Sequence, residues 1–115
     1  MMVENLENAI ARIESITELK DKVAYDHFST AQVLPFAVYL FTEETDGADD
    51  YKGVVWTDFK IELYSETRNI QLERKILSVF SDVKVDTDCE YIKDERMYMT
   101  TFSFKFPQKM TSFDV

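Results

Sequence analysis

The sequence is poor in the residues that build catalytic and metal sites. Among its 115 residues there is one histidine, His27, and one cysteine, Cys89. A single cysteine excludes an internal disulfide and a cysteine-rich zinc site. The chain also lacks a P-loop, a G-x-G-x-x-G string and an H-E-x-x-H string, which are common signatures of phosphate, dinucleotide and zinc chemistry. We therefore predict that the protein is not an enzyme and has no cofactor or metal.

Glycine, proline and long apolar runs are scarce as well. With 2 Gly, 2 Pro and 45% hydrophobic residues, the chain is neither collagen-like, nor low in complexity, nor wholly disordered. No apolar run approaches the roughly 18 residues that span a bilayer. The N-terminus lacks the basic and apolar regions of a signal peptide. These features predict one domain, made in the cytoplasm, without a membrane partner.

Positive charge is the third deficit. Lys and Arg total 13 against 22 Asp and Glu, which gives a net charge of −9. Such a surface repels the phosphates of nucleic acids, and the basic residues occur singly rather than in a patch. We therefore expect no specific binding of nucleic acid. The same acidity is also what solubility alone selects.

Two segments show the three- and four-residue spacing of an amphipathic helix. The first covers residues 3–14, and the second follows a run of helix-capping residues at 65–69. Their apolar positions are Val3, Leu6, Ile10 and Ile13 in the first segment and Leu72, Ile76, Val79 and Phe80 in the second.

The remaining apolar residues follow strand patterns. The run 36–41 is short, apolar and partly aromatic, which favours a buried strand. Residues 55–64, 83–92 and 98–106 alternate with period two, and 23–25 suggests a short extended piece. The order α-β-β-α-β-β predicts an α+β domain, with a mainly antiparallel sheet of about four strands and both helices on one face. The domain covers 1–106, with a mobile acidic hairpin loop at 42–52 and a tail at 107–115.

One predicted strand face is a candidate interaction surface. In the 55–64 strand, Trp56 and Tyr64 fall on the face that otherwise carries charge. Large aromatics on an outward face are typical of protein interfaces. We therefore assign these two residues to a subunit or partner interface. The adjacent loop contributes five acidic candidates to the same surface, namely Glu43, Glu44, Asp46, Asp49 and Asp50.

A second acidic group lies on the predicted strand 83–92. Asp86, Asp88 and Glu90 share one face, with successive carboxylates about 6.8 Å apart. Carboxylates that converge can bind Mg²⁺ or Ca²⁺. This spacing is nevertheless what any polar strand face produces, and the 43–50 loop lacks the calcium-loop pattern. We therefore predict no metal site at either place.

The order of elements and several strings resemble the tail-terminator, or head-to-tail joining, proteins of long-tailed bacteriophages and prophages. The similarity spans roughly residues 3–106 and concerns fold pattern rather than a catalytic signature. Its strings are KVAY at 22–25, LPFAVY at 34–39, IELYS at 61–65 and MYMTTFSF at 97–104, with Glu73, Ile76 and Leu77 in the helix between.

The resemblance implies a structural role. Proteins of this family form a ring, usually of six subunits, that caps the tail tube and presents a docking surface to the head connector. The implied partners are further copies of the chain, the tail tube protein and the connector. The implied location is the virion, assembled in the cytoplasm of the bacterial host. The family offers neither catalytic residues nor a cofactor to carry over.

A different class of function fits the acidity. Small acidic α+β proteins also act as inhibitors that mimic nucleic acid or mask a basic partner. The 43–50 loop and the face of Asp86, Asp88 and Glu90 would then be the binding surface. Self-association separates the two hypotheses, because an inhibitor acts as a monomer or dimer and a terminator acts as a ring.

Overall fold

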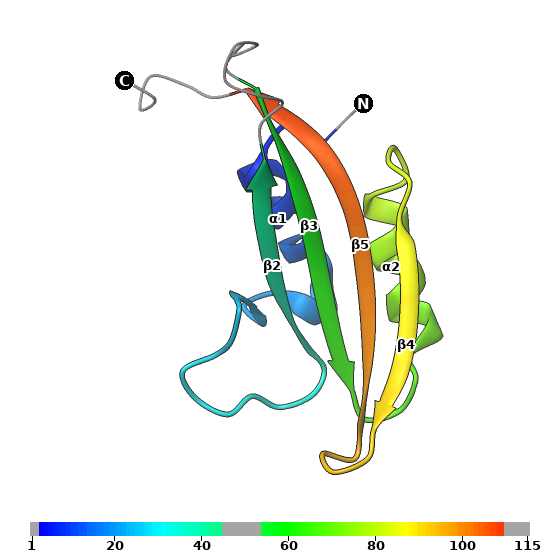
Figure 1. Cartoon of the computed structure of the whole chain (residues 1–115). Coiled ribbons are helices and arrows are strands. Elements are labelled where there is room, and N and C mark those ends of the chain that lie inside the picture. The colour runs from blue at the N-terminus through cyan, green and yellow to red at the C-terminus, as the bar shows by residue number, and fades with distance from the viewer. Residues whose placement is uncertain (1–2, 45–53, 110–115) are drawn as a thin grey trace.

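The computed structural model of the protein describes residues 3–44 and 54–109 (Figure 1). The fold is α+β, as the sequence predicts. In chain order, the elements are α1 (Leu6–Glu14), the short 3₁₀ helix η1 (Thr17–Leu19), β1 (Val23–Tyr25), β2 (Phe36–Glu44), β3 (Val54–Ser65), α2 (Ile70–Val79), β4 (Asp86–Ile92) and β5 (Met97–Lys109).

The strands form one sheet in the order β1-β2-β3-β5-β4. All neighbours are antiparallel except β1, which lies parallel to β2 with Val23 opposite Ala37. The extended piece expected after the first helix is therefore a fifth strand. Three residues are too few to show a period, so its pairing depends on contact with β2 and could not be read from the sequence.

Both helices begin at an asparagine that caps them. The side chain of Asn5 accepts a hydrogen bond from the Asn8 amide at 2.8 Å, and that of Asn69 accepts one from the Leu72 amide at 3.0 Å. Each cap satisfies an amide that the first turn leaves without a helical partner. Figure 1 shows α1 and α2 on the same side of the sheet. No helix within 3–44 and 54–109 is long and apolar enough to cross a membrane.

The core lies between the helices and one face of the sheet. On that face Phe59 is opposite Phe104 and Ile61 is opposite Phe102. Phe102 is fully buried and Phe104 is 6% exposed, so one face of the period-two pattern expected over 98–106 lies in the core. Their strand lies between β3 and β4. The helices contribute the buried residues Ala9, Ile13, Leu72 and Ile76.

Two strand ends differ from the sequence-based expectation. β2 runs to Glu44, so 42–44 belong to the strand and pair with β3, with Glu44 opposite Trp56. The rest of the expected 42–52 loop, from residue 45, lies outside the described residues. β5 continues through Pro107 to Lys109, past the expected domain end at 106. Pro107 has no backbone N–H to donate to a neighbouring strand. β4 pairs with β5 only as far as Ser103, so at Pro107 there is no β4 residue that would need such a donor.

Candidate interaction surface on the helix-free face of the sheet

The face of the sheet turned away from α1 and α2 carries Trp56, Tyr64 and Glu44, three of the interface candidates that the sequence singled out. Opposite residues of neighbouring strands share a face, so the register defines this helix-free face. From the four longer strands it comprises Phe36, Val38, Leu40, Thr42 and Glu44 of β2; Trp56, Asp58, Lys60, Glu62 and Tyr64 of β3; Met97, Met99, Thr101, Ser103, Lys105 and Pro107 of β5; and Asp86, Asp88, Glu90 and Ile92 of β4.

Apolar side chains cross one end of this face as a continuous strip. The rings of Phe36 and Tyr64 are stacked with centroids 5.2 Å apart, and Phe28 packs edge-on against Phe36 at 5.5 Å. Tyr64 lies opposite Met99 on β5. All four side chains are partly exposed. We call Phe28, Phe36, Tyr64 and Met99 the apolar strip; it joins the segment before β2 to three strands.

The hydroxyl of Tyr64 is held in place by a hydrogen bond. It donates a hydrogen bond to Oε1 of Glu62 at 2.8 Å. Burial raises the pKa of Tyr64 well above its ordinary value, and the Glu62 carboxylate adds to that rise. Tyr64 is therefore a neutral, fixed ring at physiological pH, with its apolar edge available for contact.

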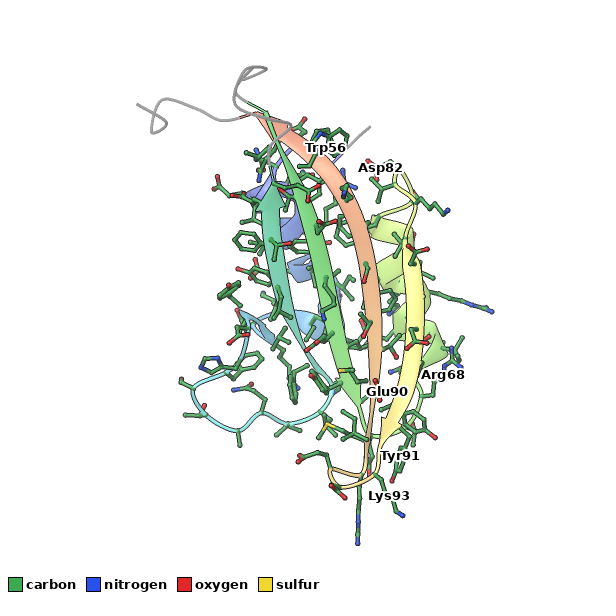
Figure 2. The ribbon with its side chains drawn as sticks, viewed as in Figure 1. Trp56, Arg68, Asp82, Glu90, Tyr91 and Lys93 are labelled. Atoms are coloured by element: carbon green, nitrogen blue, oxygen red, sulfur yellow. The ribbon has the colours of Figure 1, made fainter. Side chains whose placement is uncertain are left out.

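Trp56 lies on the same face, as the sequence predicts, but at the other end of the sheet. Tyr64 is eight positions further along β3, which corresponds to about 27 Å of extended chain. Figure 2 shows Trp56 at one end and Glu90 at the other, and Glu90 pairs with Met99 of the strip. The two predicted aromatics are thus separate contacts rather than one patch.

The acidic candidates of the loop are divided between the two faces. Glu44 is on the helix-free face, where Lys105 Nζ lies 3.4 Å from its Oε1. Glu43 points to the other face and accepts a hydrogen bond from Gln108 at 3.0 Å. Both are therefore held by β5. Asp46, Asp49 and Asp50 lie outside the described residues.

A shallow groove of about 630 Å³ is lined by residues of β2, β3 and β5. On the helix-free face it lies between Trp56 at one end of β3 and the apolar strip at the other. Leu40, Asp58, Lys60, Ser103 and Lys105 are among the residues that line it. Its two lysines already have carboxylate partners, because Lys60 lies 3.6 Å from Glu62 and Lys105 lies near Glu44 and Asp58. Because both lysines are already paired with carboxylates, the groove does not favour an anion.

His27 and Cys89 are not part of the apolar strip, and neither lines the groove. His27 is exposed, with Nδ1 2.9 Å from Oδ2 of Asp26. Cys89 is partly buried on the helix side of β4, and its Sγ lies 3.3 Å from Oγ1 of Thr100. Across 3–44 and 54–109, no group of three or more acidic, cysteine or histidine side chains is placed to hold a metal ion.

The interface candidates named from the sequence include Tyr64 but not the other three residues of the strip. Met99, like Tyr64, falls on a strand face that is otherwise polar, whereas Phe28 lies in an irregular segment and Phe36 has the pattern of an ordinary strand position. The available signal was the run 36–41, in which neither alternate set is polar. A strand that is apolar on both sides indicates a sheet with a second face to cover.

Comparison with known proteins assigns no family. No protein-family model matches the sequence, and no curated protein matches it. The resemblance to tail terminators therefore rests on local strings and on the order of elements.

Proposed function

We propose that the protein is a structural assembly protein of a long-tailed bacteriophage or prophage. In this role it forms a ring, expected to be a hexamer, that closes the tail tube and joins it to the head connector. The apolar strip carries the proposal, because the helices fill the opposite face of the sheet and, among the residues that the structure describes, no helix covers Phe36, Tyr64 and Met99. Partly exposed aromatics in a contiguous row are typical of subunit contacts.

The size of the strip suits reversible assembly. Full burial of a large apolar side chain contributes about 1.5–3 kcal/mol, and these side chains are partly buried already. Four of them supply a few kcal/mol, which gives weak pairwise association once the entropy of binding is subtracted. In a closed ring each subunit contacts two neighbours, so the ring is more stable than an isolated pair of subunits held by one contact.

The net charge fits a passage for DNA and opposes the ring at the same time. Six subunits at −9 each carry −54. An acidic lumen lets DNA slide without adhering. The same charge repels subunits from one another, with a reach of about 8 Å at physiological ionic strength. Assembly is therefore expected to need salt, divalent cations or the tail tube as a template.

The row of exposed acids on β4 favours a second candidate function. Asp86, Asp88 and Glu90 are all exposed on one face. In the alternative, the protein is a small acidic inhibitor that occupies the basic site of another protein. It then works as a monomer or dimer and does not need the apolar strip.

The test compares ring formation in variants of two tyrosines. Tyr64→Ser removes the centre of the strip, and Tyr25→Ser removes a ring that is 54% exposed on the opposite face. Electron microscopy and light scattering at high protein concentration are expected to show rings for the parent chain and for Tyr25→Ser. Tyr64→Ser should need at least tenfold more protein. Mass that stays monomeric throughout, with no binding to tail tubes, would favour the inhibitor.

A further inference from the structure

The outer edge of the sheet at β4 has features that the ring does not use. β4 pairs with β5 along one side and is the last strand in the sheet order (Figure 1). None of its seven residues is buried, and five are exposed. In the described part of the chain its other side has no strand partner. Such an edge presents a row of backbone donors and acceptors that another strand can pair with.

The two faces of this edge differ in chemistry. On the helix-free face Asp86, Asp88 and Glu90 form an unbroken row of carboxylates. On the helix side Tyr91 is 50% exposed, and its ring packs against Tyr98 with centroids 5.0 Å apart. Figure 2 shows Glu90 and Tyr91 near the end of the strand. A strand added here meets negative charge on one face and an aromatic pair on the other.

The carboxylate row excludes a second copy of the same strand. An antiparallel pair of β4 strands with both helix-free faces on one side sets acids opposite acids. Like charges directly opposite one another destabilise a strand pair. A strand with lysine or arginine at alternate positions would instead be attracted by these carboxylates, because opposite charges would lie across from one another. The charge pattern therefore blocks self-pairing and selects a basic partner.

We propose that the β4 edge binds an extended segment of another protein as a sixth strand. The segment carries lysine or arginine at alternate positions, which face Asp86, Asp88 and Glu90. Its other side chains are uncharged and cover Tyr91. Main-chain hydrogen bonds supply affinity, and the alternate basic residues supply specificity, as in other cases of strand addition. This site adjoins the apolar strip where Glu90 lies opposite Met99, but it uses the outer edge of β4 and does not depend on ring formation.

The probe is a capped nine-residue peptide with lysine at alternate positions and valine or threonine between. Binding is measured by calorimetry and mapped through the amide NMR signals of the protein. We expect the shifts to centre on β4. Asp86→Asn/Asp88→Asn/Glu90→Gln should weaken binding at least tenfold. The matched control, Glu66→Gln/Asp94→Asn/Glu95→Gln, neutralises three exposed acids elsewhere and should change affinity less than threefold.

Two modified peptides separate strand addition from simple charge attraction. One has the same composition with its lysines grouped together, and the other is N-methylated at alternate backbone amides. Both should bind the unmodified protein at least tenfold more weakly. Equal binding of either peptide would overturn the proposal, as would shifts away from β4 or no binding of the alternating peptide. These comparisons use the unmodified chain, so they hold even if the triple variant fails to fold.

Discussion

The carboxylate of Glu73 on α2 lies 3.2 Å from the hydroxyl of Thr100 on β5. Glu73 is 5% exposed, and Arg68 reaches it from the helix N-terminus with nitrogens at 3.3 and 3.4 Å. A buried carboxylate needs such partners because it has lost its water. Thr100 directly follows Met99 of the apolar strip. This contact therefore holds β5 in place from behind the candidate interface.

Loss of the Thr100 hydroxyl is the first predicted perturbation. Thr100→Val should lower the free energy of unfolding by about 1–2 kcal/mol, because it leaves a buried carboxylate with one partner fewer. The double variant Glu73→Leu/Thr100→Val should lower the free energy of unfolding by less than the sum of the two single changes, because it removes the charge and its hydrogen-bond donor together. Urea denaturation measures all three. Thr101→Val, on the helix-free face, is the control and should change stability by less than about 0.5 kcal/mol.

Phe104→Ala should be among the most damaging single changes. Its ring packs against Phe80 at 4.7 Å and Phe59 at 5.3 Å between centroids. Truncation of a buried phenylalanine costs about 3–5 kcal/mol. Phe36→Ala, on the partly exposed strip, should cost about 1–2 kcal/mol. An unchanged denaturation midpoint in Phe104→Ala would contradict the register of β5.

Acid should weaken the link between α1 and the turn after α2. Arg12 donates two hydrogen bonds to Asp82, at 2.7 and 3.1 Å, and this contact holds the pKa of Asp82 below its ordinary value of 3.8. A lowered carboxyl pKa contributes stability that is present above the unfolded pKa and is lost as pH falls through the folded one.

Asp82→Asn removes that contribution at neutral pH. The difference in unfolding free energy between parent and variant should therefore be largest above about pH 5 and should shrink as pH falls below 4. Denaturation in urea at a series of pH values checks this. Asp94→Asn, in the exposed β4–β5 turn, should show no such trend. A difference that grows toward low pH would reverse the sign and refute the assignment.

Self-association should rise with salt. At low ionic strength the repulsion between subunits of charge −9 acts over a longer range than the apolar contact, so dilute protein is expected to be monomeric. Screening shortens that range and leaves the apolar contact almost unchanged. Light scattering after size exclusion, at low and high ionic strength over a tenfold range of concentration, tests this. Association that weakens with salt would instead indicate charge-paired subunits.

Periodicity predicted well which helices and strands have a buried face, but it predicted poorly which distant residues those elements contact. The alternation along β3 places Phe59 and Ile61 in the core and Tyr64 on the other face, and the structure confirms it. Helical spacing located both helices, although the first begins at Leu6 rather than at residue 3, and the capping residues at 65–69 located the start of the second. These signals are local, because each depends on residues close together in the chain.

The missed features depend on contacts between distant residues. Val23 pairs with β2 only because the intervening segment returns alongside it. Pro107 remains in a strand because β4 has already ended. Glu73 is buried because Thr100 of β5 contacts it from a distant part of the chain, together with Arg68 from the segment just before α2. In the same way Phe28, Phe36 and Met99 become one strip only when three strands are aligned.

The order of the sheet has a consequence for synthesis on the ribosome. β3 lies between β2 and β5, so one side of β3 stays unpaired until β5, the last described strand, leaves the ribosome. The first turn of α1 also lacks a partner until then, because the Leu6 amide donates its hydrogen bond to Gln108 at 3.0 Å. Folding is therefore expected to finish only after translation of β5. A nascent chain that stops before β5 also lacks Met99, so an incomplete product cannot present the whole apolar strip.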